Sequence, residues 1–315
     1  MRRILVTAIS GDIGNGILKI LQETEDEVYG CDVNRYAAGM DKVKQFFVVP
    51  FADADNYIPT LLEICKKNDI HYLIPVNERE IEIISEKRIL FEQQDIILIM
   101  QSKQLLDVCL DKHCCMEFLR ENDVLVPESW LATEDRNIQQ KCILKPRKSN
   151  GSKNIKIIES GQILAEEEKT AQNLMQVFIP GEKEYTVGIF SDGKKTNIIS
   201  FKRKLKNGYS DFVELIELPE IAEIAEKVSS IFELRGYINI QMKEWNGKYY
   251  IFEINPRISG TVYFRHMLSY CDVLWWMDLT DRKEIPQFEC EYETAVGMRE
   301  LKEKFVEVRK RGILG

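Results

Sequence analysis

Short apolar runs alternate with amphipathic segments through the first hundred residues, and this alternation constrains the fold more than any other feature. Runs such as Arg3–Ala8, Val28–Asp32 and His71–Val76 are typical of strands buried in a sheet. Between such runs, Ile13–Gln22 and Tyr57–Lys67 place apolar residues at helical spacing. Strands that alternate with helices form parallel sheets with right-handed crossovers. The sequence therefore predicts a Rossmann-like α/β domain that ends near residue 100.

The pattern changes after this domain. Ser102–Cys109 and Asp111–Glu121 are predicted as two successive helices, and a third is predicted at Pro219–Leu234. From Cys142 onward, apolar runs are separated by Asn-Gly, Pro-Gly and Asp-Gly pairs, which are typical of antiparallel hairpins. We therefore predict an α+β region after the α/β domain, and we place the domain boundaries at 1–100, 101–179 and 180–315.

Composition excludes several classes of protein. The chain carries 43 Lys and Arg against 51 Asp and Glu, a net charge of −8, which is not typical of a nucleic-acid binder. No run approaches the roughly 18 apolar residues of a membrane span, and the first strand does not read as a signal peptide. None of the eight cysteines forms a C-x-x-C pair, so free thiols are expected. We expect a cytoplasmic protein with small-molecule ligands, no nucleic-acid or membrane partner, and a homodimer as its default assembly.

Three glycines follow the first strand, and an acidic residue ends the second. Gly11, Gly14 and Gly16 could bring backbone N–H groups onto a pyrophosphate while Asp32 held a ribose, as in dinucleotide-binding folds. However, their spacing is G-x-x-G-x-G, the reverse of the G-x-G-x-x-G fingerprint. A tight strand–helix turn is the preferred interpretation, and an NAD(P)-dependent oxidoreductase stays as an alternative.

A lysine at a strand end precedes a segment rich in small polar residues. The apolar run that begins at Cys142 delivers Lys145, and the residues from Lys148 to Ser152 follow it. Backbone N–H groups of such a loop can hold phosphate oxygens, with the lysine as a point charge. A solvated hairpin is the commoner role of such a loop taken alone, so phosphate binding is a hypothesis here.

The run from Tyr249 to Asn255 is apolar except at two positions. Glu253 and Asn255 are two residues apart and therefore face the same side of a strand. A buried carboxylate needs a partner, and a hard divalent cation takes oxygen ligands from carboxylates and amides. The alternative partner is Arg257, which follows Pro256.

Gln241 on the preceding strand is a further candidate ligand, and its place depends on the hairpin. A two-residue turn at Asn246-Gly247 would put Gln241 on the face opposite Glu253. A three-residue loop, or a bulge, would put the two side chains on the same face. The metal hypothesis therefore predicts a three-residue loop or a bulge.

Two further groups of charged residues are candidates. Glu184 begins a strand, where its carboxylate could accept two hydroxyls, although an exposed strand end is the simpler interpretation. In the basic run Lys202–Lys206, Lys202 and Lys204 share one face and Arg203 takes the other. This run and Arg265 are candidates for an anionic substrate, whereas a solvated sheet edge is the alternative for the run.

Four motifs resemble, in their order and spacing, those of the ATP-grasp superfamily: K-P-R-x-S-x-G-S, I-P-G-x-x-E-Y-T-V, N-I-Q and F-E-I-N-P-R. The likeness is greatest to the group of the carbamoyl phosphate synthetase large subunit, and more distant to biotin carboxylase and the D-alanine–D-alanine ligases. It spans nearly the whole chain, because the first domain is similar to the family's preATP-grasp domain. The resemblance implies a Rossmann-like preATP-grasp domain followed by a two-lobed ATP-grasp module.

The resemblance also implies ligands and roles. The cofactors would be ATP and Mg²⁺, with one or two ions and Mn²⁺ as a substitute. Phosphate contacts would come from Lys112 and Lys145, under a loop of Ser149, Asn150, Gly151 and Ser152. The adenine would be lined by Gln176, Val177, Phe178 and Ile179, and the ribose would be held by Glu184. The metal ligands would be Gln241, Glu253 and Asn255. The catalytic residues would be Arg257, Lys145 and Glu253.

The implied reaction is the ATP-dependent ligation of two small molecules. A carboxylate would be activated as an acyl phosphate and joined to an amine or a similar nucleophile, with release of ADP and phosphate. Many relatives carry glutamate where this chain has Gln176 or Val177, which is a departure from the pattern at the adenine. A non-catalytic ATP-binding protein on the same scaffold is the second alternative function.

Overall fold

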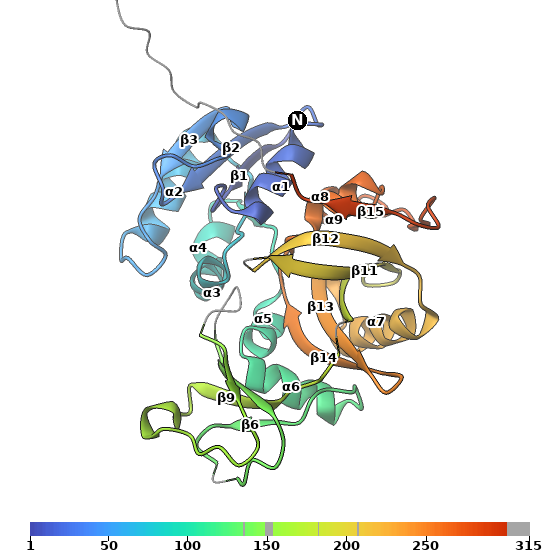
Figure 1. Cartoon of the computed structure of the whole chain (residues 1–315). Coiled ribbons are helices and arrows are strands. Elements are labelled where there is room, and N and C mark those ends of the chain that lie inside the picture. Colours follow the sequence, from blue (N-terminus) through green and yellow to red (C-terminus); the bar gives the residue numbers. More distant parts are fainter. Residues whose placement is uncertain (135, 149–153, 182, 207, 301–315) are drawn as a thin grey trace, which may run out of the picture. The chain divides into compact units, whose positions relative to one another are not determined.

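The computed structural model describes residues 1–134, 136–148, 154–181, 183–206 and 208–300, which form two compact units. The first unit contains residues 1–99 and the segment that begins at Met298, and the second contains Met100–Gly297. The first unit contains one sheet and the second contains two (Figure 1).

The first unit is a five-stranded parallel sheet with helices between the strands. The strand order is β3-β2-β1-β4-β5. The strands are β1 (Arg3–Val6), β2 (Glu27–Asp32), β3 (Gln45–Val48), β4 (Tyr72–Ile74) and β5 (Ile97–Leu98). The helices are α1 (Asp12–Leu21), η1 (Met40–Lys42), α2 (Tyr57–Asn68), α3 (Glu78–Glu86) and α4 (Arg88–Glu92). The predicted Rossmann-like α/β fold is confirmed.

Close packing explains the glycine-rich turn after β1. A Cβ atom on Gly14 would lie 2.5 Å from the Ala8 carbonyl oxygen, so only glycine lets α1 approach the strand this closely. The Asp32 carboxylate is bonded within the chain: Oδ2 accepts from the Ser10 N–H at 2.9 Å and hydroxyl at 2.7 Å, and Oδ1 accepts from the Asn34 N–H at 2.9 Å. These contacts favour the tight turn over a dinucleotide site.

The second unit begins with two helices and a small antiparallel sheet. The helices are α5 (Lys103–Cys109) and α6 (Lys112–Glu121). The sheet has the order β6-β9-β7-β8, formed by β6 (Ser129–Leu131), β7 (Cys142–Pro146), β8 (Lys156–Ile158) and β9 (Asn173–Val177), with η2 (Glu166–Glu168) before β9. A core of its own, which includes Trp130, Leu144 and Met175, packs on this sheet.

A six-stranded sheet forms the rest of the second unit. Its order is β14-β13-β10-β11-β12-β15. The strands are β10 (Glu184–Asp192), β11 (Thr196–Lys206), β12 (Tyr209–Ile216), β13 (Arg235–Trp245), β14 (Lys248–Asn255) and β15 (Val296–Met298). The helices are α7 (Pro219–Ile231), α8 (Val262–Met267) and α9 (Asp272–Thr280). The predicted change from an α/β to an α+β architecture is therefore present.

The two faces of this sheet differ in chemistry because strand residues alternate between them. Val187, Ile240 and Met242 point to the side of α5, α6 and α7, where they form the main core of the unit. Figure 1 shows α7 beside these strands. The intervening positions carry polar side chains, such as Thr186 and Gln241. The sequence thus builds one apolar face for stability and one polar face that can bind a ligand.

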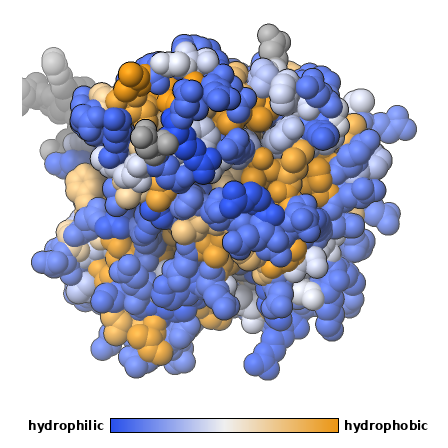
Figure 2. Space-filling model, turned by 90° about the horizontal axis from the view of Figure 1, so that it is seen from below, coloured by the Kyte–Doolittle hydropathy of each residue, from blue (hydrophilic) through white to orange (hydrophobic). Residues whose placement is uncertain are grey.

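The surface is that of an ordinary globular protein. On the face in Figure 2, hydrophilic residues predominate and hydrophobic residues form separate patches. Apolar atoms always cover part of a folded surface, so such patches are expected. Among the residues that the structure describes, no helix combines the length and the apolar character that a bilayer crossing requires.

Candidate functional site

A cavity of about 180 Å³ is lined by residues of both sheets of the second unit. Nine of the residues singled out in the sequence line it: Lys112, Lys145, Gln176, Val177, Phe178, Ile179, Glu184, Gln241 and Glu253. Asn255 and Arg257 are not among the lining residues, and the predicted phosphate loop of Ser149, Asn150, Gly151 and Ser152 lies outside the described residues. Lining residues as far apart in sequence as Lys112 and Glu253, 141 positions, therefore meet at one cavity.

The β13–β14 hairpin has a tight turn. Asn246 and Gly247 have φ angles of 51° and 71°, as the central residues of a type I′ turn require. Trp245 pairs with Lys248, so the turn contains two residues. Of the two predicted irregularities, the three-residue loop is therefore absent, and without a bulge Glu253 would pair with Ile240 and face the core.

A β-bulge at Phe252 provides that irregularity. Met242 pairs with Ile251, but the next pair along the strands is Gln241 with Glu253, which leaves Phe252 as the extra residue. Ile251 and Ile254 both belong to the core, although they are three positions apart. The bulge moves Glu253 to the polar face beside Gln241, and it is the second form of irregularity that the sequence predicted.

Oxygen-bearing side chains gather on this face. Gln241, Glu253, Asn255 and Asn239 all belong to it, because Asn239 pairs with Asn255 in the register. Asn239 is fully buried; its Nδ2 donates to Thr186 Oγ1 at 2.8 Å, and its Oδ1 has no hydrogen-bond partner in the described part of the chain. One carboxylate with several amide oxygens suits a hard divalent cation. The described residues contain no cluster of three His, Cys, Asp or Glu, so phosphate or water oxygens would complete the coordination.

Lys145 places a buried ammonium next to these oxygens. Lys145 is 6% exposed. Its Nζ donates to Gln176 Oε1 at 2.8 Å and to the Phe252 carbonyl oxygen at 3.3 Å. Burial lowers the pKa of Lys145 to about 8; Glu253 opposes this shift and Lys112 adds to it. Both hydrogen-bond partners are neutral, so a bound anion would stabilise the ammonium.

Lys112 is held at the start of α6 by a capping aspartate. The Lys112 Nζ lies 3.9 Å from Glu253 Oε1. Asp111 caps α6 by accepting from the His113 N–H at 3.0 Å, and it forms an ion pair with Arg147 at 2.6 Å. Burial works against ionisation of Asp111, but Arg147 and the amides hold the pKa of its carboxyl below the ordinary value. The arginine of the K-P-R motif thus anchors the helix that carries Lys112.

Two backbone N–H groups of the predicted adenine-lining segment are bonded within the chain. The Val177 N–H donates to the Glu128 carbonyl at 2.8 Å, and the Phe178 N–H donates to the Lys141 carbonyl at 2.9 Å. These two N–H groups therefore have acceptors within the chain, and the lining of the adenine by residues 176–179 stays a prediction. Of the amides of Val177, Phe178 and Ile179, that of Ile179 has no backbone acceptor in the described part of the chain.

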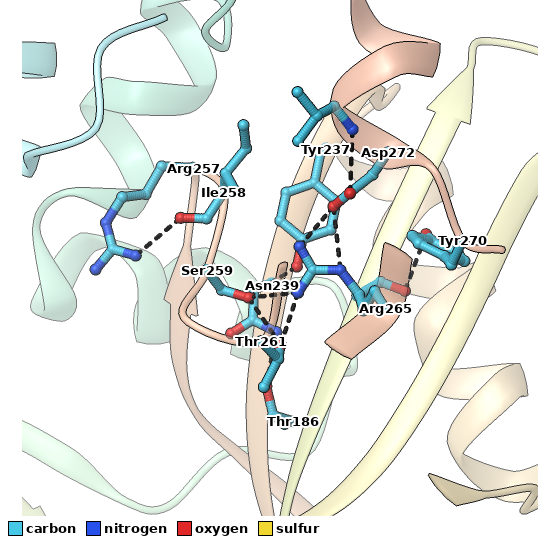
Figure 3. A network of polar contacts seen from close by, with 12 residues as sticks. Thr186, Tyr237, Asn239, Arg257, Ile258, Ser259, Thr261, Arg265, Tyr270 and Asp272 are labelled. Atoms are coloured by element: carbon cyan, nitrogen blue, oxygen red, sulfur yellow. Dashed lines mark hydrogen bonds and ion pairs between the residues drawn. The ribbon is translucent and has the colours of Figure 1, made fainter. Parts of the chain in front are cut away.

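Arg257 folds back on the end of β14. Its Nη2 donates to Asn255 Oδ1 at 3.3 Å. Its Nη1 donates to the Ile258 carbonyl oxygen at 3.1 Å (Figure 3). A guanidinium therefore lies against one of the predicted metal ligands. This arrangement places a fixed positive charge beside the oxygen-rich end of the sheet.

Comparison with known proteins matches two parts of the chain to family models. Residues 109–261 match the family model described as an ATP-grasp domain, and residues 4–99 match that of the PylC-like N-terminal domain. Residues 109–261 therefore form an ATP-grasp domain. The predicted superfamily is thus confirmed, and the match supports the prediction of a ligase-class enzyme. No curated protein matches the sequence.

Solved structures share the fold of this ATP-grasp chain at low identity. N5-carboxyaminoimidazole synthetase from Staphylococcus aureus, solved with ADP, has a TM-score of 0.75 at 15% identity and covers 95% of this chain and 82% of its own. Biotin carboxylase from Campylobacter jejuni has a TM-score of 0.69 at 14% identity, with 91% and 72% covered. L-amino acid ligase from Bacillus licheniformis has a TM-score of 0.69 at 11% identity, with 89% and 74% covered.

A buried ion pair in the second unit corrects one prediction. Arg265 is fully buried, and its Nη2 lies 2.5 Å from Asp272 Oδ2 (Figure 3). Its Nη1 donates to Ser259 Oγ at 2.8 Å and Thr261 Oγ1 at 2.6 Å, and its guanidinium lies over the Tyr237 ring at 4.5 Å. The prediction that Arg265 could receive an anionic substrate is wrong, because Asp272 and the hydroxyls occupy it. Its role is to fasten the loop that follows Pro256.

Sequence reasoning missed several cavity residues. Lys243 lines the cavity, as do the apolar residues Pro127, Ile143, Ile155, Leu205 and Phe252. Arg203, which the sequence placed only in the basic run, lines it as well. Within the basic run, the Lys202 ammonium lies 3.7 Å from Glu214 and its side chain is 38% exposed, as expected for a sheet surface. The sequence showed that Lys202 and Arg203 lie on opposite faces of a strand, but it did not show which of the two faces lines the cavity.

Proposed function

We propose that this protein is an ATP-dependent ligase that activates a small-molecule carboxylate as an acyl phosphate and joins it to an amine or similar nucleophile. The observation that carries the proposal is the bulge at Phe252. It brings Gln241 and Glu253 into register on the polar face, beside the ammonium groups of Lys112 and Lys145. Oxygen ligands for a cation and positive charges for phosphates thus line one cavity, the combination that phosphoryl transfer requires.

The proposed assignments follow from the positions of the side chains. The adenine would lie against the segment 176–179 and the ribose near Glu184. The polyphosphate would lie between Lys145 and Lys112, where Lys145 regains full protonation as it binds the anion. Gln241, Glu253 and Asn255 would hold Mg²⁺, which when bound neutralises phosphate oxygens and fixes their orientation.

The chain's own residues would act mainly by orientation and by charge. In the first step a carboxylate oxygen attacks the γ-phosphorus, the bond to the β-phosphate oxygen breaks, and ADP leaves. Lys145 and Arg257 would stabilise the negative charge on the transferred group. In the second step the nucleophile attacks the acyl carbon, and inorganic phosphate leaves as the carbon–oxygen bond breaks.

Ligand-dependent unfolding tests the proposal. Mg·ATP at about 100 times its Kd should add roughly 2.7 kcal/mol to the free energy of unfolding, which raises Tm measurably. NADH and NADPH serve as comparison ligands, and we expect them to leave Tm unchanged. If a nicotinamide cofactor stabilises the protein and Mg·ATP does not, the ligase proposal is wrong and the oxidoreductase alternative gains support.

A second measurement separates an enzyme from a non-catalytic nucleotide binder. Pairs of carboxylic acids and amines are screened for ADP release, with each acid and each amine tested alone as controls. We expect ADP only where both substrates are present. Nucleotide binding without ADP release from any pair would favour the non-catalytic alternative. A further structural neighbour, the biotin carboxylase domain of the Hydrogenobacter thermophilus 2-oxoglutarate carboxylase (TM-score 0.72 at 14% identity), was solved as a dimer. A homodimer therefore remains our proposal for this chain and is tested by sedimentation.

A further inference from the structure

Three charged residues form a row across the polar face of the six-stranded sheet. Glu184 on β10 pairs in the register with Arg203 on one side and with Lys243 on the other. All three residues line the cavity. The Lys243 ammonium also lies 5.3 Å from the centre of the Phe178 ring, on the segment proposed to line the adenine. One carboxylate is thus placed between two cations at the nucleotide end of the site.

The contact between Arg203 and Glu184 is directional. Arg203 Nε and Nη2 both donate to the same carboxylate oxygen, Glu184 Oε1, at 2.9 Å and 2.6 Å. The Arg203 side chain is 9% exposed and that of Glu184 is 20% exposed, so both are largely shielded from water. A planar guanidinium with two N–H groups on one oxygen fixes the orientation of the carboxylate better than a single flexible ammonium would.

We propose that Arg203 is a positioning residue that sets the selectivity of the site for ribonucleotides over deoxyribonucleotides. Arg203 occupies Glu184 Oε1 with two N–H donors, so Oε2 is the oxygen left for the ligand, and we assign to it a single ribose hydroxyl. The sequence had suggested that the Glu184 carboxylate accepts two hydroxyls. This inference rests on the proposed function, because it requires that the cavity binds a nucleotide.

The positive charge of Arg203 also contributes to the preference for ribonucleotides. A carboxylate next to a polyphosphate meets like-charge repulsion, and a cation within hydrogen-bond distance offsets it. Without Arg203, Glu184 can rotate away from the ligand or bind Lys243 instead. In either case the oxygen that accepts the ribose hydroxyl is no longer fixed, and the preference for ribose declines.

Equilibrium binding of ATP and its deoxy analogues tests this inference. Isothermal titration calorimetry compares Mg·ATP, Mg·2′-deoxyATP and Mg·3′-deoxyATP on the wild-type protein, R203M, R203K and E184Q. We expect the wild type to bind one deoxy analogue about tenfold to a hundredfold more weakly than ATP, as for a hydrogen bond to a charged acceptor, and the other within about threefold. In R203M and E184Q this ratio should fall to within about threefold of unity, with an intermediate value for R203K.

K202M is the matched control, because Lys202 is the preceding residue of β11 and pairs with Tyr185 rather than Glu184. It should retain the wild-type ratio, and an unchanged Tm in R203M would show that Arg203 is not merely structural. If R203M does not fold, R203K carries the comparison. A wild type that discriminates while R203M discriminates equally overturns the inference but leaves the proposed function intact. Strong discrimination against both analogues overturns the single-hydroxyl assignment, and a wild type that binds no Mg·ATP overturns the proposed function itself.

Discussion

The buried ammonium of Lys145 predicts how nucleotide affinity depends on pH. Burial moves the pKa of this residue from 10.5 to about 8, and its hydrogen-bond acceptors, Gln176 and the Phe252 carbonyl, are neutral. At 1.36 kcal/mol per unit of pKa, this shift means that burial destabilises the charged form relative to the neutral form by roughly 3 kcal/mol. A bound polyphosphate returns much of this energy because it is an anion beside the ammonium. The complex therefore keeps its proton to higher pH than the unliganded protein does.

The sign of the effect follows from this difference. Below about pH 7, Lys145 is protonated with or without nucleotide, and affinity should not depend on its titration. Above about pH 8, binding must first take up a proton, so the Kd for Mg·ATP should rise by up to about tenfold per pH unit. Phosphate groups lose their last proton near pH 6, so they are ionised throughout this range. Calorimetry between about pH 7 and pH 9.5 measures both the Kd and the proton uptake.

Replacement of Gln176 by glutamate supplies the control. A carboxylate at the position of Oε1, 2.8 Å from Nζ, should raise the pKa of Lys145 and keep it protonated. We expect Q176E to bind Mg·ATP with an affinity that is nearly independent of pH up to about pH 9.5. K145M should bind weakly at every pH. A wild-type Kd that stays constant across this range, or a Q176E profile identical to that of the wild type, would refute the reasoning.

Three further predictions concern the metal site, the buried ion pair and the glycine turn. E253Q should abolish ADP formation while Tm stays within a few degrees of the wild type, and normal turnover would remove Glu253 from the metal site. R265M, which leaves Asp272 buried without its partner, should lower the free energy of unfolding by about 3–5 kcal/mol in urea denaturation, and R265M/D272L should regain part of it. G14A should destabilise the first unit by roughly 1–3 kcal/mol because its Cβ meets the Ala8 carbonyl, so an unchanged transition would contradict the packing.

Local sequence determined much of the fold. The alternation of apolar runs and amphipathic segments predicted the parallel sheet, because both periodicities are properties of single elements. The Asn246-Gly247 pair marked a turn because its residues accept positive φ, and the structure gives them 51° and 71°. The reversed glycine spacing indicated a tight turn, and the position of Gly14 against Ala8 gives its physical cause.

The chemistry of the candidate site was only partly visible in the sequence. Glu253 and Asn255 stood out because polar residues in an apolar strand need partners. Their place beside Gln241 depended on a choice between a loop and a bulge, and the sequence left that choice open. Lys243 was not identified, and Arg203 was assigned only to the basic run, because the relation of both residues to Glu184 arises from strand pairing. Arg265 was assigned to the wrong role, because a cation seven residues from Asp272 gives no local sign that the two form a buried pair.

The sequence by itself therefore determined the types of element, the position of the turns and the kinds of side chain that could serve a phosphate and a cation. Only the tertiary structure decided which of these side chains share a cavity. The physical reason is that strand register is set by the packing of a whole face. Ile251 and Ile254 both enter the core, and the strand satisfies them only by adding Phe252 as a bulge, which turns Glu253 toward Gln241.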